Sequence, residues 1–254
     1  VRNVKMSIAR LSASFTFFII TNGSSNHELP TEEAQHIVKV LRLKENDTIW
    51  LTDGKGNLYE VSITLATPKH CTVKLQKKQH INKTWPSFFH LAVAPTKNMD
   101  RNEWMVEKAT EIGIDRITFL DCIFSERHQI RTDRLEKISI AAMKQSHKMW
   151  KTQIDDITKF KDFATTEWNG QKFIAHCYDD ADLSDSPIKK VPLQNILRKQ
   201  TDAIVCIGPE GDFSIDEVRF AISQGFIPIS LGKSRLRTET AAIVATHLLH
   251  LFSL

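Results

Sequence analysis

Two glycine-containing segments in the last quarter of the chain have residue types that suit backbone binding of a small ligand. Residues 207–214 read IGPEGDFS, residues 231–240 read LGKSRLRTET, and each segment directly follows an apolar run. Four of the nine glycines lie between positions 208 and 232. Glycine lets the main chain approach a ligand closely, and open α/β sheets bind ligands beyond the carboxyl ends of their strands. We therefore predict a ligand pocket between these loops, with ordinary strand-to-helix turns as the alternative.

The tripeptide Gly232-Lys233-Ser234 also ends the phosphate-binding motif G-x-x-x-x-G-K-[ST]. That motif requires its first glycine at position 227, where this chain has Ile227. Residues 227–231 read IPISL, which is typical of a buried strand, and a strand cannot curl around phosphates. The motifs G-x-G-x-x-G, G-x-S-x-G and H-E-x-x-H are absent from the sequence. These patterns argue against a nucleotide-splitting enzyme and against a dinucleotide-binding fold.

The elements that must position the two loops alternate between strand and helix from about residue 87 onward. Apolar patterns such as FFHLAVAP, DRITFLDC, KFIAHCY, DAIVCIG and FIPISL are separated by helical patterns. Strands that lack polar alternation and are separated by helices indicate a parallel sheet covered on both faces. Two helix starts match capping boxes, Asp100 with Glu103 and Ser214 with Glu217. The fold class predicted for this part is α/β.

The first third of the chain has a different pattern, in which short strands dominate. Several short strands with one helix predict a small β-barrel. The expected elements are a strand at 15–20, a helix at 31–43, and strands at 48–52, 58–65 and 71–75.

The chain is therefore expected to divide into three parts. Residues 1–14 are predicted to form a flexible leader, residues 15–80 the β-barrel domain and residues 81–254 the α/β domain. The polar stretch 79–87 suits a linker between the last two. The apolar run at 15–20 is too short to span a membrane.

The charge distribution favours a polyanionic partner for the first part of the chain. Residues 1–90 contain 12 Lys and Arg against 7 Asp and Glu, whereas the whole chain has a net charge of only +4. A basic module joined to a near-neutral one suits a nucleic-acid-binding protein, although a merely solvated basic surface explains the charge equally well. The four cysteines lie far apart, without C-x-x-C or histidines at metal spacing. They are predicted to be buried, reduced thiols of a cytosolic protein without a metal site.

Taken together, the C-terminal motifs resemble those of a known family. The segments IGPEGDFS and SLGKSRLRTETAA are similar to those of the RsmE family of 16S ribosomal RNA uridine-N3 methyltransferases, in the SPOUT superfamily. Further segments fit, including TEIG at 110–113, SER at 125–127 and AAMKQS at 141–146, and the resemblance covers residues 15–254. It implies an α/β domain with a trefoil knot, preceded by a PUA-like barrel.

Three positions depart from the family pattern. The family often has a second glycine where this chain has Asp212, an arginine where it has Lys148, and a small hydrophobic residue where it has Arg235. These departures leave the implied methyltransferase activity intact but obscure the details of RNA contact.

The resemblance implies S-adenosylmethionine as the cofactor, held by three loops, the first of them after KFIAHCY. Arg237 is expected to stabilise the anionic uracil, and Glu210 or Glu239 to act as a base or to orient Arg237. The expected cofactor-binding residues are His176, Cys177, Ile207, Gly208, Pro209, Glu210, Gly211, Leu231, Gly232, Leu236, Arg237 and Thr240. The expected RNA-binding residues are Lys39, Arg42, Lys44, Lys55, Arg127 and His128.

The implied substrate is 16S rRNA or the small ribosomal subunit, and the expected enzyme is a cytoplasmic homodimer without metal or membrane. Residues 241–251 are apolar around most of a helix circumference, which suits a subunit interface. One alternative is a SPOUT methyltransferase acting on a ribose 2′-hydroxyl or on tRNA, and another is a non-catalytic RNA-binding assembly factor. The identity of the base, the dimer geometry, the state of the RNA substrate and the native start of the chain stay open.

Overall fold

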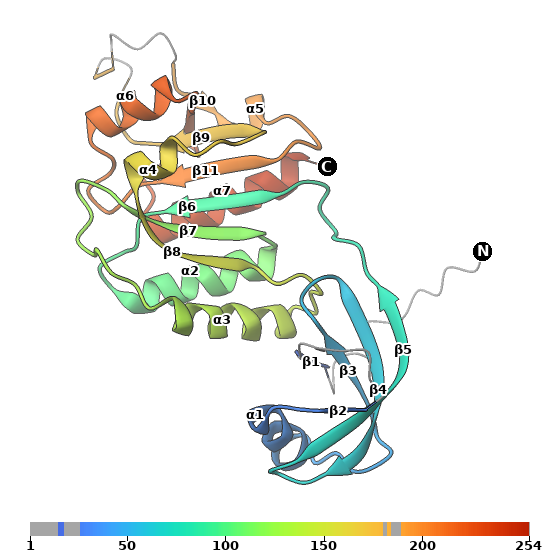
Figure 1. Cartoon of the computed structure of the whole chain (residues 1–254). Helices are drawn as coiled ribbons and strands as arrows, with labels where there is room; N and C mark the ends of the chain where they lie inside the picture. The colour runs from blue at the N-terminus through green and yellow to red at the C-terminus, as the bar shows by residue number, and fades with distance from the viewer. Residues whose placement is uncertain (1–14, 18–25, 180–181, 184–188, 254) are drawn as a thin grey trace. The chain divides into compact units, whose positions relative to one another are not determined.

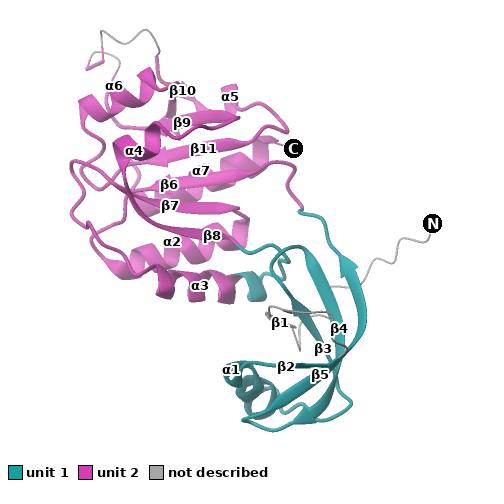
Figure 2. Cartoon of the chain, in the orientation of Figure 1, with its two compact units in different colours: residues 1–83, 143–151 teal, residues 84–142, 152–254 magenta. Residues whose placement is uncertain are grey.

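The computed structural model describes residues 15–17, 26–179, 182–183 and 189–253 (Figure 1). The predicted leader at 1–14 lies outside these residues, and so does the second half of the strand predicted at 15–20. The chain divides into two compact units (Figure 2). Unit 1 contains residues 1–83 together with Met143–Lys151, and unit 2 contains residues 84–142 and 152–254.

Unit 1 is built on a five-stranded sheet in the order β1-β3-β4-β5-β2. Strands β3, β4, β5 and β2 pair antiparallel, whereas β1 runs parallel to β3. Buried apolar side chains from these strands and from the helical segment, including Ile37, Ile49 and Val61, form one core. The elements are β1 (Phe15–Phe17), β2 (Asn26–Glu28), α1 (Thr31–Gln35), the π-helix η2 (His36–Val40), β3 (Thr48–Thr52), β4 (Asn57–Ala66) and β5 (Cys71–His80).

The segment Met143–Lys151 joins unit 1 through specific contacts with the β3–β4 hairpin and with α1. The N–H of Gly56 donates to the carbonyl of Met149 at 2.8 Å, and Lys144 forms an ion pair with Glu33 at 2.5 Å. A side chain at position 56 would have its Cβ 2.5 Å from the Trp150 ring, so this hairpin position requires glycine. The sequence pattern had placed these residues in the second domain.

Unit 2 is built on a seven-stranded sheet in the order β10-β12-β9-β11-β6-β7-β8, and all of its strand pairs are parallel. The central strands β6 and β11 are buried at every residue, as expected for a sheet covered on both faces. The strands are β6 (Phe89–Val93), β7 (Arg116–Asp121), β8 (Gln153–Lys159), β9 (Gln171–Ala175), β10 (Val191–Pro192), β11 (Ala203–Ile207) and β12 (Ile227–Ser230).

The helices of unit 2 pack in two groups. Helices α2 and α7 lie side by side, whereas α4 and α6 pack on a core that includes Phe160, Phe213 and Phe226 (Figure 1). Each fully buried phenylalanine contributes about 1.5–3 kcal/mol to stability. The helices are α2 (Met99–Ile112), α3 (Thr132–Gln145, of which residues 143–145 belong to unit 1), α4 (Phe160–Ala164), α5 (Leu193–Ile196), α6 (Ile215–Ser223) and α7 (Thr238–Ser253). None of the described helices is long and apolar enough to cross a membrane.

Helix α2 begins differently from the sequence prediction. Asn98 is its N-cap, because the Asn98 side chain accepts a hydrogen bond from the N–H of Asp100 at 2.9 Å. The predicted capping box of Asp100 with Glu103 is therefore wrong. The predicted box of Ser214 with Glu217 is confirmed, with both of its reciprocal hydrogen bonds present.

Candidate methyl-donor site

Three loops follow neighbouring parallel strands and meet at the carboxyl ends of these strands. Strand β9 lies between β12 and β11, and all three are parallel, so their carboxyl ends share one edge of the sheet. The loops are 176–179 after β9, 208–214 after β11 and 231–237 after β12. The two glycine-containing loops predicted from the sequence thus lie on either side of a third loop. This is the edge at which open α/β sheets bind ligands.

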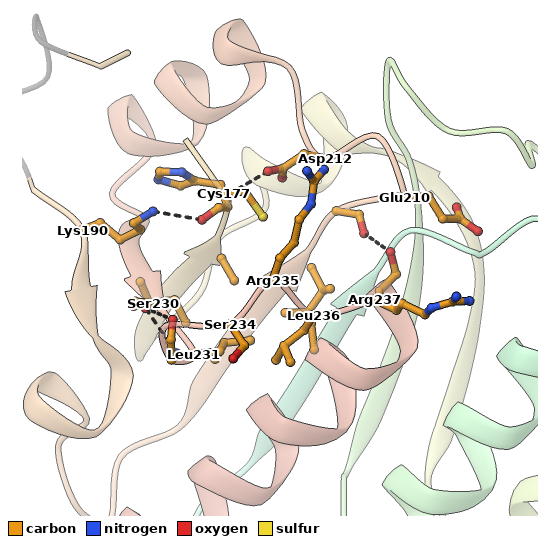
Figure 3. A pocket seen from close by; sticks show the side chains of 18 of the residues that line it. Cys177, Lys190, Glu210, Asp212, Ser230, Leu231, Ser234, Arg235, Leu236 and Arg237 are labelled. Atoms are coloured by element: carbon orange, nitrogen blue, oxygen red, sulfur yellow. Dashed lines mark hydrogen bonds between the residues drawn. The ribbon is translucent and has the colours of Figure 1, made fainter. Parts of the chain in front are cut away.

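A cavity of about 630 Å³ lies between the three loops (Figure 3). Its size falls within the range of pockets that bind small molecules and cofactors. Its lining combines backbone of the glycine-containing loops with the apolar side chains of Ile207, Ile229, Leu231 and Leu236. Charged side chains of both signs also line it, namely Asp179, Lys190, Glu210, Asp212, Lys233, Arg235 and Arg237.

The loop 208–214 turns tightly and is fixed at both ends. A Cβ at Gly208 would lie 2.9 Å from the backbone nitrogen of Phe213, so only glycine fits there. The buried carboxylate of Glu217 accepts hydrogen bonds from the N–H and hydroxyl of Ser214, at 2.8 and 3.0 Å. Its other oxygen accepts the N–H of Ile123 at 2.9 Å. This wall of the cavity is therefore held in place by the helix that follows it.

The loop 231–237 uses its glycine for a different reason. Gly232 has φ +136°, a conformation that other residues rarely adopt, but a Cβ there would meet nothing within 4 Å. The Ser230 hydroxyl donates to the Gly232 carbonyl at 2.9 Å and accepts its N–H at 3.2 Å. Thr238, which opens α7, donates its hydroxyl to the Gly208 carbonyl at 3.0 Å and so connects this loop to the other wall.

The structure brings most of the predicted cofactor-binding residues together. The cavity is lined by His176, Cys177, Ile207, Gly208, Pro209, Glu210, Leu231, Gly232, Leu236 and Arg237. Gly211 and Thr240 do not line it. Gly211 packs instead against the loop that follows β7, because a Cβ at position 211 would lie 3.1 Å from the Cβ of Phe124.

The three predicted catalytic residues lie in different surroundings. Arg237 is exposed at the cavity, and its side chain extends away from Cys177 and Lys190 (Figure 3). Glu210 is exposed, and its carboxylate accepts the N–H of Lys97 at 3.0 Å. Glu239 is 8 % exposed and does not line the cavity. Its carboxylate lies in the first turn of α7, where the helix dipole stabilises negative charge.

The predicted RNA-binding residues of unit 2, Arg127 and His128, form hydrogen bonds within that unit. Arg127 donates to the carbonyls of Thr96 and Lys97, at 3.1 and 2.6 Å, and so orders the loop after β6. His128 pairs with Asp121 at 2.6 Å. A hydrogen bond from Lys97 to Glu126 raises the pKa of the Lys97 ammonium group.

In unit 1 the predicted RNA-binding residues Lys39, Arg42, Lys44 and Lys55 are all exposed. The sequence reasoning missed three further exposed lysines on β5, namely Lys74, Lys77 and Lys78. For Lys77 and Lys78 the signal was the pair of basic residues just beyond the strand predicted to end at Leu75.

Five charged residues that line the cavity were not predicted to bind the cofactor, namely Asp179, Lys190, Asp212, Lys233 and Arg235. Asp212 stood out in the sequence only as a departure from a glycine. Lys190 follows an irregular polar stretch with no motif around it. The cysteine prediction also needs correction, because Cys71, Cys122 and Cys206 are buried but Cys177 is exposed. Among the described residues, no group of three or more His, Cys, Asp or Glu side chains could hold a metal ion.

Comparison with known families agrees with this architecture. Residues 83–250 match the model of an RNA methyltransferase domain, and residues 29–76 match that of an RNA methyltransferase PUA domain. A crystal structure named as a probable rRNA methyltransferase from Porphyromonas gingivalis is 36% identical with a TM-score of 0.86, and the match covers 94% of this chain and 98% of that one. Fold and site together define an RNA methyltransferase with an attached PUA domain.

Named relatives show to which family of RNA methyltransferases the chain belongs. The ribosomal RNA small subunit methyltransferase E of Rickettsia conorii is 31% identical over 225 residues, which cover 87% of this chain and 88% of the relative. The chain belongs to the ribosomal RNA small subunit methyltransferase E family. A methyltransferase structure from Legionella pneumophila, determined with bound S-adenosylmethionine, is 26% identical with a TM-score of 0.80, and the match covers 93% of this chain and 96% of that one.

Proposed function

We propose that this protein transfers a methyl group from S-adenosylmethionine to N3 of a uridine in the 16S rRNA of the small ribosomal subunit. The observation that carries the proposal is the cavity between three loops at the carboxyl edge of β12, β9 and β11, in a chain of this family. The names of the relatives support small-subunit rRNA as the substrate, and the Legionella structure supports the cofactor.

The cavity fits the methyl donor in size and chemistry. Apolar side chains of Ile207, Leu231 and Leu236 suit the faces of an adenine, and exposed backbone of 232–235 can read its polar edge. The carbonyls of Ile207 and Gly208 already accept one hydrogen bond each, from Ala94 and Thr238, and keep a second lone pair. When bound, S-adenosylmethionine supplies an electrophilic methyl group on a sulfonium ion.

The residues of this chain then have to make the uracil nitrogen nucleophilic. N3 carries a weakly acidic proton, so the enzyme must accept that proton and stabilise the anion. We assign the stabilising role to Arg237, a permanent cation with a planar fork of donors. Glu210 is better placed than Glu239 to take the proton, because Glu210 lines the cavity whereas Glu239 is buried beside it.

The decisive experiment is methylation of small-subunit rRNA from a strain that lacks this modification, with the product nucleoside identified by mass spectrometry. We expect N3-methyluridine. Replacing Arg237 with alanine should lower kcat about 100-fold or more and leave the affinity for S-adenosylmethionine nearly unchanged, with partial activity in Arg237→Lys. Arg198→Ala, an exposed arginine outside the cavity, is the matched control. A different methylated nucleoside would overturn the target, and no cofactor binding at millimolar concentration would overturn the activity.

We also propose that the enzyme acts in the cytoplasm as a homodimer that pairs through α7. Supporting this, α7 carries the exposed apolar residues Leu251 and Phe252 beyond its buried face, and exposed apolar groups mark interaction surfaces. Light scattering after gel filtration should give twice the chain mass of 29.0 kDa. A mass of one chain at micromolar concentration would contradict the dimer.

A further inference from the structure

The loop 176–179 has no regular secondary structure and is held by side chains from outside it. The Asp212 carboxylate accepts the N–H of Cys177 at 2.7 Å. Lys190, which follows the loop in the chain, donates from its ammonium group to the carbonyl of Tyr178 at 2.7 Å and to that of His176 at 3.4 Å. The Asp212 carboxylate thus accepts a hydrogen bond from the loop backbone, and the Lys190 ammonium group donates hydrogen bonds to it (Figure 3).

The backbone at Asp212 adopts a conformation that carries a local energetic cost. Asp212 has φ +69°, in the left-handed region that a residue with a side chain seldom occupies, although aspartate tolerates it better than most. Its second carboxylate oxygen accepts the N–H of Phe213 at 2.7 Å, which fixes the carboxylate relative to its own backbone. Such conformations persist where surrounding contacts determine them, and they cluster at ligand sites.

Both side chains line the cavity, so their contacts with the loop lie at the site and not in the core. Hydrogen bonds in which one partner is charged are shorter and stronger than neutral ones. A third, neutral bond joins the same elements, from the Tyr178 hydroxyl to the Phe213 carbonyl at 2.8 Å. It provides an uncharged comparison for the two charged contacts.

We infer that Asp212 and Lys190 are positioning residues, which together hold the loop 176–179 in the shape that receives the methyl donor. This inference rests on the proposed function, since the donor is taken to be S-adenosylmethionine. It assigns the aspartate at 212 a task that a glycine there could not perform. It also makes cofactor affinity depend on Lys190, which lies outside the glycine-containing segments, and on Asp212, which was not among the predicted cofactor-binding residues.

Titration calorimetry with S-adenosylmethionine and S-adenosylhomocysteine on the full chain tests the inference. We expect Asp212→Ala and Lys190→Met each to weaken binding of both ligands about tenfold or more. Asp212→Asn keeps one oxygen acceptor and should recover part of the loss. The double variant should lose less than the product of the single losses, because contacts that hold one loop are coupled. Asp216→Asn and Lys189→Met, exposed neighbours outside the cavity, should bind like the wild type.

Hydrogen exchange provides a readout that needs no ligand. The Cys177 amide donates to Asp212, so peptides covering 176–179 should exchange faster in Asp212→Ala than in the wild type or in Tyr178→Phe. Equal exchange, or wild-type affinity in both Asp212→Ala and Lys190→Met, would overturn the inference. A loss of affinity that follows a fall in melting temperature and is not relieved in Asp212→Asn would show a merely structural role. Failure of the wild type to bind cofactor would instead contradict the proposed function, and the exchange data would still judge the loop contacts.

Discussion

The two glycine-containing walls of the cavity are held very differently. In the loop 208–214, Phe213 is fully buried and the Glu217 carboxylate accepts both the N–H and the hydroxyl of Ser214. In the loop 231–237, residues 232–235 are exposed, and the Ser230 hydroxyl bonds only the backbone of Gly232. The first wall is therefore built before the ligand arrives. The second has few contacts to lose, so we expect ligand binding to order it.

The largest effect is expected from Gly208→Ala in the built wall. The added Cβ would lie 2.9 Å from the Phe213 nitrogen and 3.2 Å from the Asp212 carbonyl carbon, and neither backbone atom can turn aside. Overpacking of this kind costs about 1–3 kcal/mol of stability. We expect a melting temperature several degrees lower and cofactor binding weakened about 30-fold or more by calorimetry.

Gly225→Ala is the matched control for that variant. Gly225 also has a positive φ, of +85°, but its nearest neighbour is the flexible end of Lys172 at 3.7 Å. It should cost some stability through backbone strain and leave cofactor affinity unchanged. If Gly208→Ala bound the cofactor as well as Gly225→Ala does, the first wall would not be prebuilt.

A smaller effect is expected from Gly232→Ala in the exposed wall. Alanine is strained at φ +136°, but nothing lies within 4 Å of the added Cβ and the exposed loop can relax. We expect cofactor affinity to fall about three- to tenfold with almost no change in melting temperature. A stability loss as large as that of Gly208→Ala would contradict the difference between the two walls.

The smallest effect concerns the thiol of Cys177, on the loop between the walls. Cys177 is an exposed residue, but partial desolvation by the surrounding protein raises the pKa of its thiol, and the nearby Asp212 carboxylate raises it further. Less thiolate is then present at a given pH, so iodoacetamide should alkylate Cys177 more slowly than a free cysteine at pH 8. The rate should keep rising above the pH at which a free cysteine levels off.

Bound S-adenosylmethionine should protect Cys177, which lines the cavity. Mass spectrometry of the modified peptide gives the rate, and the three buried cysteines serve as internal references. Alkylation as fast as that of glutathione, unaffected by the cofactor, would place this loop outside the ligand site.

The parallel sheet could be predicted from sequence because its inner strands are mostly apolar and lack polar alternation. Strand β8 could not, because QIDDITK mixes polar and apolar residues at a sheet edge. Strand β2 was missed since its three residues, NHE, have no apolar pattern and are held by pairing with β5. The trefoil knot expected from the resemblance stays a prediction.

The candidate site could be predicted where glycines marked its loops, at Gly208 through close backbone approach and at Gly232 through a positive φ. It could not be predicted where a contact joins residues far apart in sequence, as between Asp212 and Cys177. Glu239 is a different case. Its place near Arg237 in the motif suggested a base or a partner that orients Arg237, and the burial of its side chain in the first turn of α7 could not be predicted from the motif.

The position of β6 in the sheet has a consequence for synthesis of the chain. Its residues 89–93 pair with β11, at 203–207, and the N–H of Phe88 bonds the Asp202 carboxylate across 114 residues. At roughly 5–20 residues per second, a ribosome needs about 6–23 s to make that partner. Until then this strand, which is fully buried in the folded sheet, has one open edge, a template for aggregation. The nascent chain is therefore expected to need shielding by a chaperone over this interval.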